Sequence, residues 1–145
     1  MRFLHFDRVI SIEPGKRIET VACTSLKDEY LRGHFDARPL VPGTVVLEAM
    51  LQSLGWLVIR SHDFRVLPLF SMLEDCSVPA DLSPGDRIDL VGELLSTNPK
   101  GSMGRATASI AGREIASLAR VLYGHYPAKD PAALRETFRC YGGSA

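Results

Sequence analysis

The residues with the clearest chemical potential lie in one segment, GHFDARPLVPGTVVLEAMLQ, which spans positions 33–52. It contains a histidine, His34, and a carboxyl group, Glu48, and side chains of these types serve as general bases and acids in enzymes. Between them stands Pro42-Gly43, where a helix is expected to begin and where the first backbone N–H groups lack partners inside the helix. A base, an acid and a donor for developing negative charge are the groups that proton abstraction with loss of a leaving group requires.

The same segment resembles the FabZ/FabA family of 3-hydroxyacyl-acyl-carrier-protein dehydratases. The family pattern runs G-H-F-P-G-x-P-x-x-P-G, then four residues, then Glu or Asp, and ends in A-x-x-Q. The positions of this sequence that match it are Gly33, His34, Phe35, Pro39, Pro42, Gly43, Glu48, Ala49 and Gln52. The upstream stretch from Phe3 and the downstream Pro84-Gly85-Asp86 turn are also similar to the family, so the resemblance covers about residues 3–124.

The resemblance implies a fold and a reaction. The fold is the α+β hot-dog fold, in which an antiparallel sheet wraps one long central helix. The reaction is dehydration of 3-hydroxyacyl thioesters, on acyl carrier protein or CoA, to trans-2-enoyl thioesters in fatty-acid or related lipid or polyketide synthesis. The implied site residues are His34 and Glu48 for catalysis, Gly43 for binding the thioester oxygen, and Phe35, Pro42 and Gln52 for support of the site. The implied assembly is a homodimer, or an oligomer of dimers, in which His34 of one chain faces Glu48 of the other.

The apolar pattern of the sequence around Glu48 predicts the role of this residue in proton transfer. From Thr44 to about Arg60 the sequence is apolar nearly all round, as expected of a buried helix, and its polar stripe is Thr44, Glu48 and Gln52 at a spacing of four. Burial raises the pKa of a carboxyl group, so Glu48 is expected to act as the protonated acid and His34 as the neutral base.

Three departures from the family pattern affect these expectations. Asp36 and Ala37 replace the usual proline and glycine after His-Phe, and a carboxylate two residues from His34 is expected to raise the pKa of that histidine. Pro79-Ala80 stands where the family often has two basic residues that help to dock the acidic carrier protein. We also expect the protein to lack the family's upstream leader of the type LLPHR.

Other interpretations remain open from the residues alone. His34 could be an ordinary hydrogen-bonded histidine, and Glu48 could neutralise a buried arginine such as Arg38. The chain could also be a hot-dog thioesterase, or a non-catalytic acyl-binding hot-dog subunit.

The elements that position these residues follow from the hydrophobic pattern. Two strands come first, then the buried helix, then a meander of about four strands, with a short final helix that begins at Asp130-Pro131 as N-cap and first residue. The expected strands span residues 3–13, 17–24, 66–78, 87–94, 103–110 and 114–123. We therefore expect a hot-dog domain over residues 1–127, followed by a short helix and tail over residues 128–145.

Composition narrows the class of protein further. The 145 residues suffice for one domain, and 17 basic residues balance 17 acidic ones, so bulk charge does not favour nucleic acid or membranes as partners. The three cysteines fit neither a disulfide framework nor a zinc site, and the four histidines form no HxH or HxxxH pair. We expect a cytoplasmic protein without a signal peptide, cofactor or metal.

Overall fold

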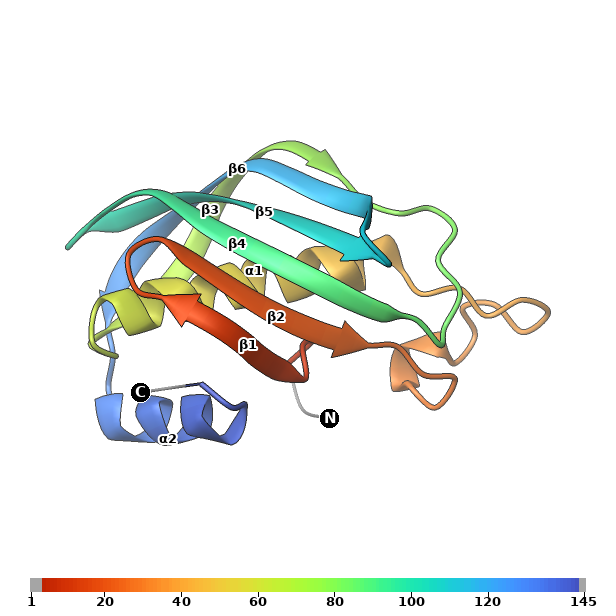
Figure 1. Ribbon diagram of the computed structural model, residues 1–145, viewed down its shortest axis with the longest axis horizontal. Helices are drawn as coiled ribbons and strands as arrows, with labels where there is room; N and C mark the ends of the chain where they lie inside the picture. Colours follow the sequence, from red (N-terminus) through yellow and green to blue (C-terminus); the bar gives the residue numbers. More distant parts are fainter. Residues whose placement is uncertain (1–3, 144–145) are drawn as a thin grey trace.

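The structure is a computed structural model that describes residues 4–143. In chain order its elements are β1 (Arg8–Glu13), β2 (Arg17–Cys23), the 3-10 helix η1 (Glu29–Leu31), α1 (Gly43–Ser61), β3 (Val66–Ser77), β4 (Arg87–Asn98), β5 (Gly101–Ile110), β6 (Arg113–Pro127) and α2 (Pro131–Cys140). The strands form one antiparallel sheet in the order β1-β2-β4-β5-β6-β3, which curves around α1 (Figure 1). This arrangement confirms the predicted hot-dog fold.

Strand order differs from the expected meander at one point. Strands β4, β5 and β6 are joined by tight turns and pair in sequence, but β3 pairs with β6 and lies at the far edge of the sheet. The apolar run of β3 did not alternate, so its pattern gave no indication of its neighbour, and residues 78–86 are long enough to carry the chain back across the sheet. Strand β1 begins at Arg8, later than predicted, and Phe3 lies outside the described residues.

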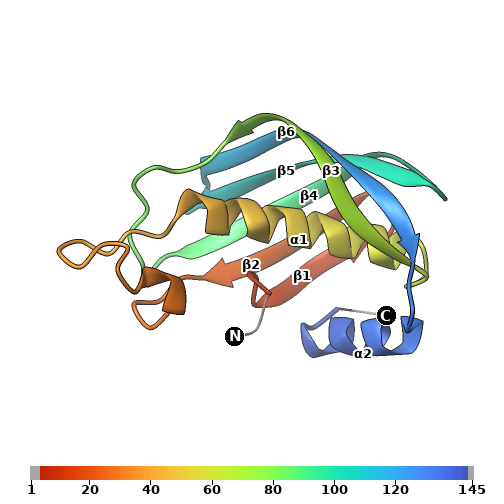
Figure 2. The same cartoon turned by 180° about the vertical axis from the view of Figure 1, so that it is seen from behind.

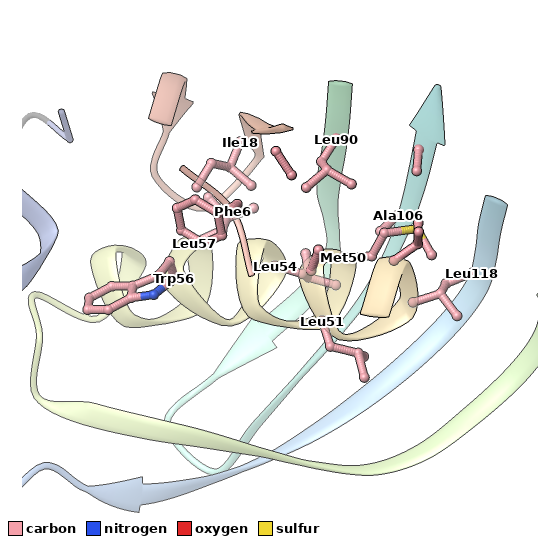
Figure 3. Packing of buried hydrophobic residues seen from close by; sticks show 14 of the residues in the cluster. Phe6, Ile18, Met50, Leu51, Leu54, Trp56, Leu57, Leu90, Ala106 and Leu118 are labelled. Atoms are coloured by element: carbon pink, nitrogen blue, oxygen red, sulfur yellow. The ribbon is translucent and has the colours of Figure 1, made fainter. Parts of the chain in front are cut away.

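The core lies between α1 and the concave face of the sheet. Leu54 and Leu57 of the helix are fully buried, and they pack with residues such as Ile18 and Leu90 from the strands (Figure 3). Glycines let the helix approach this closely, because a Cβ atom at Gly104 would lie 2.8 Å from a methyl carbon of Leu54. The helix is therefore held against the middle of the sheet by apolar burial, the main favourable term in folding.

Helix α2 follows β6 and packs at the C-terminal end of α1 (Figure 2). Its predicted start is confirmed, since the Asp130 carboxylate accepts a hydrogen bond of 2.9 Å from the Ala133 N–H and Pro131 is the first helical residue. Phe138 is fully buried and stacks on Trp56 at a ring distance of 5.5 Å. None of the helices in residues 4–143 has the length and apolar character needed to cross a membrane.

Candidate active site

His34 lies in the loop between η1 and α1, which projects from the end of the molecule where α1 begins (Figure 2). Two bonds close the loop around it. The Leu40 N–H donates to the His34 carbonyl at 2.9 Å, and the His34 Nδ1 atom lies 2.9 Å from the Leu40 carbonyl oxygen. A carbonyl oxygen can only accept, so Nδ1 carries the hydrogen and the neutral ring keeps its lone pair on Nε2. The hydrogen bond to Leu40 thus leaves the Nε2 lone pair available, as the predicted role of base requires.

Phe35 packs directly on this histidine. The two rings stack with centroids 4.5 Å apart, while 55% of Phe35 stays exposed in the single chain. Asp36 and Ala37 follow in the exposed turn that the Phe35 N–H closes onto the Arg38 carbonyl at 3.3 Å. The predicted supporting residue therefore holds one face of the His34 ring, and it presents its own outer face to solvent.

Glu48 is half-buried on the second turn of α1, and its carboxylate is fixed by Gln52 one turn later. The Gln52 amide oxygen accepts the His5 backbone N–H at 2.8 Å, so the amide NH₂ group is the end that donates to Glu48 Oε1, also at 2.8 Å. Because Oε1 is held as an acceptor, the proton of an uncharged Glu48 belongs on Oε2. Gln52 therefore decides which oxygen of Glu48 can donate a proton.

Glu48 opens into a largely apolar groove of about 370 Å³, which we call the Glu48 groove. It lies between the side of α1 that faces away from the sheet centre and the first part of β3. Residues that line it include Glu48, Gln52, Gly55, Trp56, Leu67 and Leu134. A carboxyl group at one end of an apolar groove is suited to a ligand that has a polar reacting group and an apolar tail.

Tyr123 forms part of the groove wall close to Glu48. Burial and then the nearby Glu48 charge raise the pKa of Tyr123 well above its ordinary value. Its hydroxyl donates to the Leu51 carbonyl at 2.8 Å, so the ring is a fixed wall that keeps its proton. No motif or spacing in the sequence pointed to Tyr123, which was expected only as the last residue of a strand.

Within one chain the two predicted catalytic residues are not brought together in one cavity. His34 is not among the residues of the described chain that line the Glu48 groove. Its loop belongs to the end of the molecule where α1 starts, whereas the groove extends from Glu48 toward the end of that helix. One chain therefore places a carboxyl group in a groove and an imidazole on a separate loop.

Gly43 is the first residue of α1, after Pro42 as N-cap, and no side chain caps the helix start. The N–H groups of the first turn are thus free of side-chain caps, as the predicted donor role requires. Gly43 also has a packing role that the sequence did not reveal. A Cβ atom at this position would lie 2.5 Å from the Pro79 carbonyl oxygen, so the chain before β4 crosses the helix start at a distance that only glycine allows.

The alternative partner for Glu48 is contradicted by the structure. Arg38 forms its ion pair with Asp81, at 2.6 Å, on the surface. The carboxyl of Glu48 instead accepts from the neutral amide of Gln52. Among the residues that the structure describes, no group of three or more His, Cys, Asp or Glu side chains is placed to hold a metal ion.

Comparisons with known proteins identify the family of this chain. Residues 1–74 match the family model described as a FabA-like domain. A 3-hydroxyacyl-[acyl-carrier-protein] dehydratase FabZ from Symbiobacterium thermophilum is 30% identical over 134 residues, which are 92% of this chain and 94% of the relative.

Solved structures also superpose on the fold. The dehydratase heterocomplex ApeI:P from Xenorhabdus doucetiae gives a TM-score of 0.66 at 16% identity, covering 93% of this chain and 90% of that one. A hypothetical thioesterase with coenzyme A from Streptococcus pneumoniae gives 0.62 at 8% identity, covering 85% and 88%. At these identities the two structures show the shared fold, and they do not separate one hot-dog reaction from another.

Proposed function

This chain belongs to the FabA-like family, and on that premise we propose that it dehydrates 3-hydroxyacyl thioesters to trans-2-enoyl thioesters. The curated relatives are named as dehydratases acting on acyl carrier protein, which confirms the hydro-lyase class predicted from the motif. The observation that carries the proposal is the carboxyl of Glu48, held by Gln52 at one end of an apolar groove.

The proposed reaction needs three groups. The Nε2 lone pair of His34 removes a proton from C2 of the acyl chain, and Glu48 gives its Oε2 proton to the hydroxyl on C3. The C3–O bond breaks, the electron pair of the broken C2–H bond forms the double bond, and water leaves. The negative charge that builds on the thioester oxygen is stabilised by the N–H groups at the start of α1, near Gly43.

The separation of His34 from the Glu48 groove supports a site shared between two chains. The outer edge of β3 is unpaired in the described chain, and it carries exposed apolar residues, among them Leu69 at 58% and Phe70 at 53%. An unpaired apolar edge favours pairing with another strand. We propose that two copies pair through β3, so that His34 of one copy reaches the Glu48 groove of the other.

Refolding a mixture of two inactive variants tests the shared site. His34→Ala and Glu48→Gln proteins are unfolded together and refolded, and random two-fold pairing makes about half of the dimers mixed. Each mixed dimer has one intact site, so activity should return to roughly a quarter of wild type. If both residues acted within one chain, every site would carry one lesion. A dimeric but inactive mixture would therefore contradict the shared site.

The reaction itself is tested by product analysis. Purified protein is given 3-hydroxyacyl thioesters of acyl carrier protein and of CoA, and both the enoyl product and the free thiol are measured. The proposal expects enoyl product without thiol release, and comparing the two carriers identifies the one that is used. Thiol release with free acid would indicate a thioesterase, and binding without turnover would indicate a non-catalytic acyl-binding subunit.

A further inference from the structure

The Glu48 groove has a direction along α1. Glu48, Gln52, Gly55 and Ile59 line it from one side at spacings of three and four residues, so they lie on one face of the helix. Ile59 lies eleven positions after Glu48, which corresponds to about 16 Å along the helix axis. The opposite wall also runs along the helix. Tyr123 forms its hydrogen bond to Leu51 near the Glu48 end, and Pro68 lies one turn further along, 3.7 Å from a Cβ atom built at Gly55.

Polarity falls along this direction. Glu48 and Gln52 make the first turn of the groove polar, and the wall beyond them is formed by Gly55, Trp56 and Ile59 together with apolar residues of β3. A reacting group placed at Glu48 would therefore have its apolar tail directed toward the C-terminal end of α1.

Helix α2 stands across that end. It is anchored by Phe138, which is fully buried against Trp56 and also meets Phe64 at a ring distance of 5.7 Å. Arg135 adds an ion pair of 2.9 Å to Asp63 and lies 4.8 Å above the Phe64 ring. These contacts fix the helix directly after Leu134, the residue of α2 that lines the groove.

A second groove adjoins the Glu48 groove at Leu134. The second groove, of about 600 Å³, lies between α2 and the start of β3 and is lined by apolar residues that include Leu69, Tyr126 and Ala133. Leu67, Leu69 and Leu134 line both grooves, and Leu134 is the one that α2 contributes to the wall between them.

We propose that α2 closes the far end of the Glu48 groove and that Leu134 sets the longest acyl chain that the enzyme accepts. This inference rests on the proposed function, which places the reacting carbons at Glu48. A chain shorter than the groove gains binding with each methylene it buries, about fourfold per group. A longer chain meets the Leu134 side chain and loses that gain. Removing the Leu134 side chain opens the way into the second groove.

Chain-length profiles test the proposal directly. kcat/KM is measured for 3-hydroxyacyl thioesters of increasing length with wild type, Leu134→Ala, Leu134→Phe and a control, Glu136→Ala, whose exposed side chain lies on the same helix outside both grooves. We expect Leu134→Ala to accept chains longer by at least two carbons, Leu134→Phe to reject the longest wild-type substrates at least tenfold, and the control to match wild type. If the two substitutions only loosened α2, they would not shift the longest accepted chain in opposite directions. An unchanged limit in both variants would overturn the proposal.

Trp56 gives a second measurement that needs no turnover. It is the one tryptophan of the sequence and lines the far half of the groove. Saturated acyl-pantetheine thioesters without the 3-hydroxyl group are titrated while its emission is recorded. We expect the emission to change only when the acyl chain is long enough to reach the third turn from Glu48. The longest chain that binds should be longer in Leu134→Ala and shorter in Leu134→Phe than in wild type.

The two measurements distinguish two kinds of failure. A protein that dehydrates nothing, yet shows the Trp56 response and its dependence on Leu134, would overturn the proposed reaction and support the role of α2. Turnover with a silent Trp56 at every chain length and a limit independent of Leu134 would leave the reaction standing and overturn the role of α2.

Discussion

The two sides of α1 differ in how far a single chain completes them. The side toward the sheet is closed, with Met50, Leu54, Leu57 and Val58 all fully buried. The side toward β3 carries Glu48 and opens into a groove, and the β3 strand beyond it leaves Leu69 and Phe70 more than half exposed. Both sides are apolar, but only the first is fully covered by other parts of the chain. This difference indicates that the first side stabilises the fold, and the second is the side where we propose that a ligand and a second copy bind.

The largest expected effect is on the chemistry of the open side. Glu48→Gln should lower kcat by at least ~10²-fold, as loss of a general acid does, while the melting temperature stays close to that of wild type. The matched control is Glu114→Gln, the same change at an exposed position of β6, which should keep wild-type turnover. Steady-state kinetics and thermal melts of both variants check this. Near-normal turnover in Glu48→Gln would remove Glu48 from the mechanism.

The closed side should respond in stability. Leu54→Ala removes a fully buried side chain against Gly104 and should lower the free energy of unfolding by about 2–5 kcal/mol. Leu69→Ala, on the exposed edge, should change the free energy of unfolding of a single chain by about 0.5 kcal/mol or less. Urea unfolding at two protein concentrations separates the cases, because a loss caused by weaker pairing depends on concentration. A large, concentration-independent loss in Leu69→Ala would erase the contrast between the two sides.

Two glycines of α1 provide a smaller contrast. Gly43→Ala places a Cβ atom 2.5 Å from the Pro79 carbonyl oxygen, so the backbone there must shift. This shift should lower the free energy of unfolding by about 1–3 kcal/mol, and it should also lower activity. Gly55→Ala finds only ordinary contact with Pro68 at 3.7 Å and should stabilise the helix by about 0.5–1 kcal/mol. The structure thus gives Gly43 a packing role beside the donor role that the sequence predicts. Equal melting temperatures for the two variants would contradict this account.

The smallest expected effect concerns acid stability at the C-terminal end of α1. His62 and His125 meet at a ring distance of 4.7 Å, and they are bridged by Thr97 and Ser102 through bonds of 2.7, 2.6 and 2.9 Å. Burial lowers the pKa of both histidines, and for His125 the charge of His62 adds to it.

Because the folded pKa values lie below the unfolded ones, the unfolded chain binds protons first as the pH falls through about 6.5. The stability that the neutral pair contributes is complete above that pH and is lost on acidification. Between pH 7.5 and 5.5 the melting temperature of wild type should fall more than that of a His62→Gln/His125→Gln variant. An equal fall in melting temperature in the two proteins would show that the histidine pair does not contribute to the pH dependence of stability.

The sequence by itself determined the elements whose patterns are local. The apolar run over Thr44 to Arg60 predicted α1 to within one residue at each end, because a helix apolar nearly all round belongs in a core. Asp130-Pro131 located the start of α2, because capping depends only on neighbouring residues. The motif spacing identified the family and put Glu48 and Gln52 one turn apart, which their hydrogen bond requires.

The tertiary structure decided what depends on contacts between distant segments. A continuous apolar run does not indicate which strand it pairs with, so only the fold placed β3 at the edge beside β6. Tyr123 and Leu134 reach the groove from elements far along the chain, where neither residue type nor spacing indicates a site. The close approach of Pro79 to Gly43 likewise arises from the path of the chain between β3 and β4. A local pattern fixes which face of an element is apolar, but which segment covers that face is settled only when the whole chain packs.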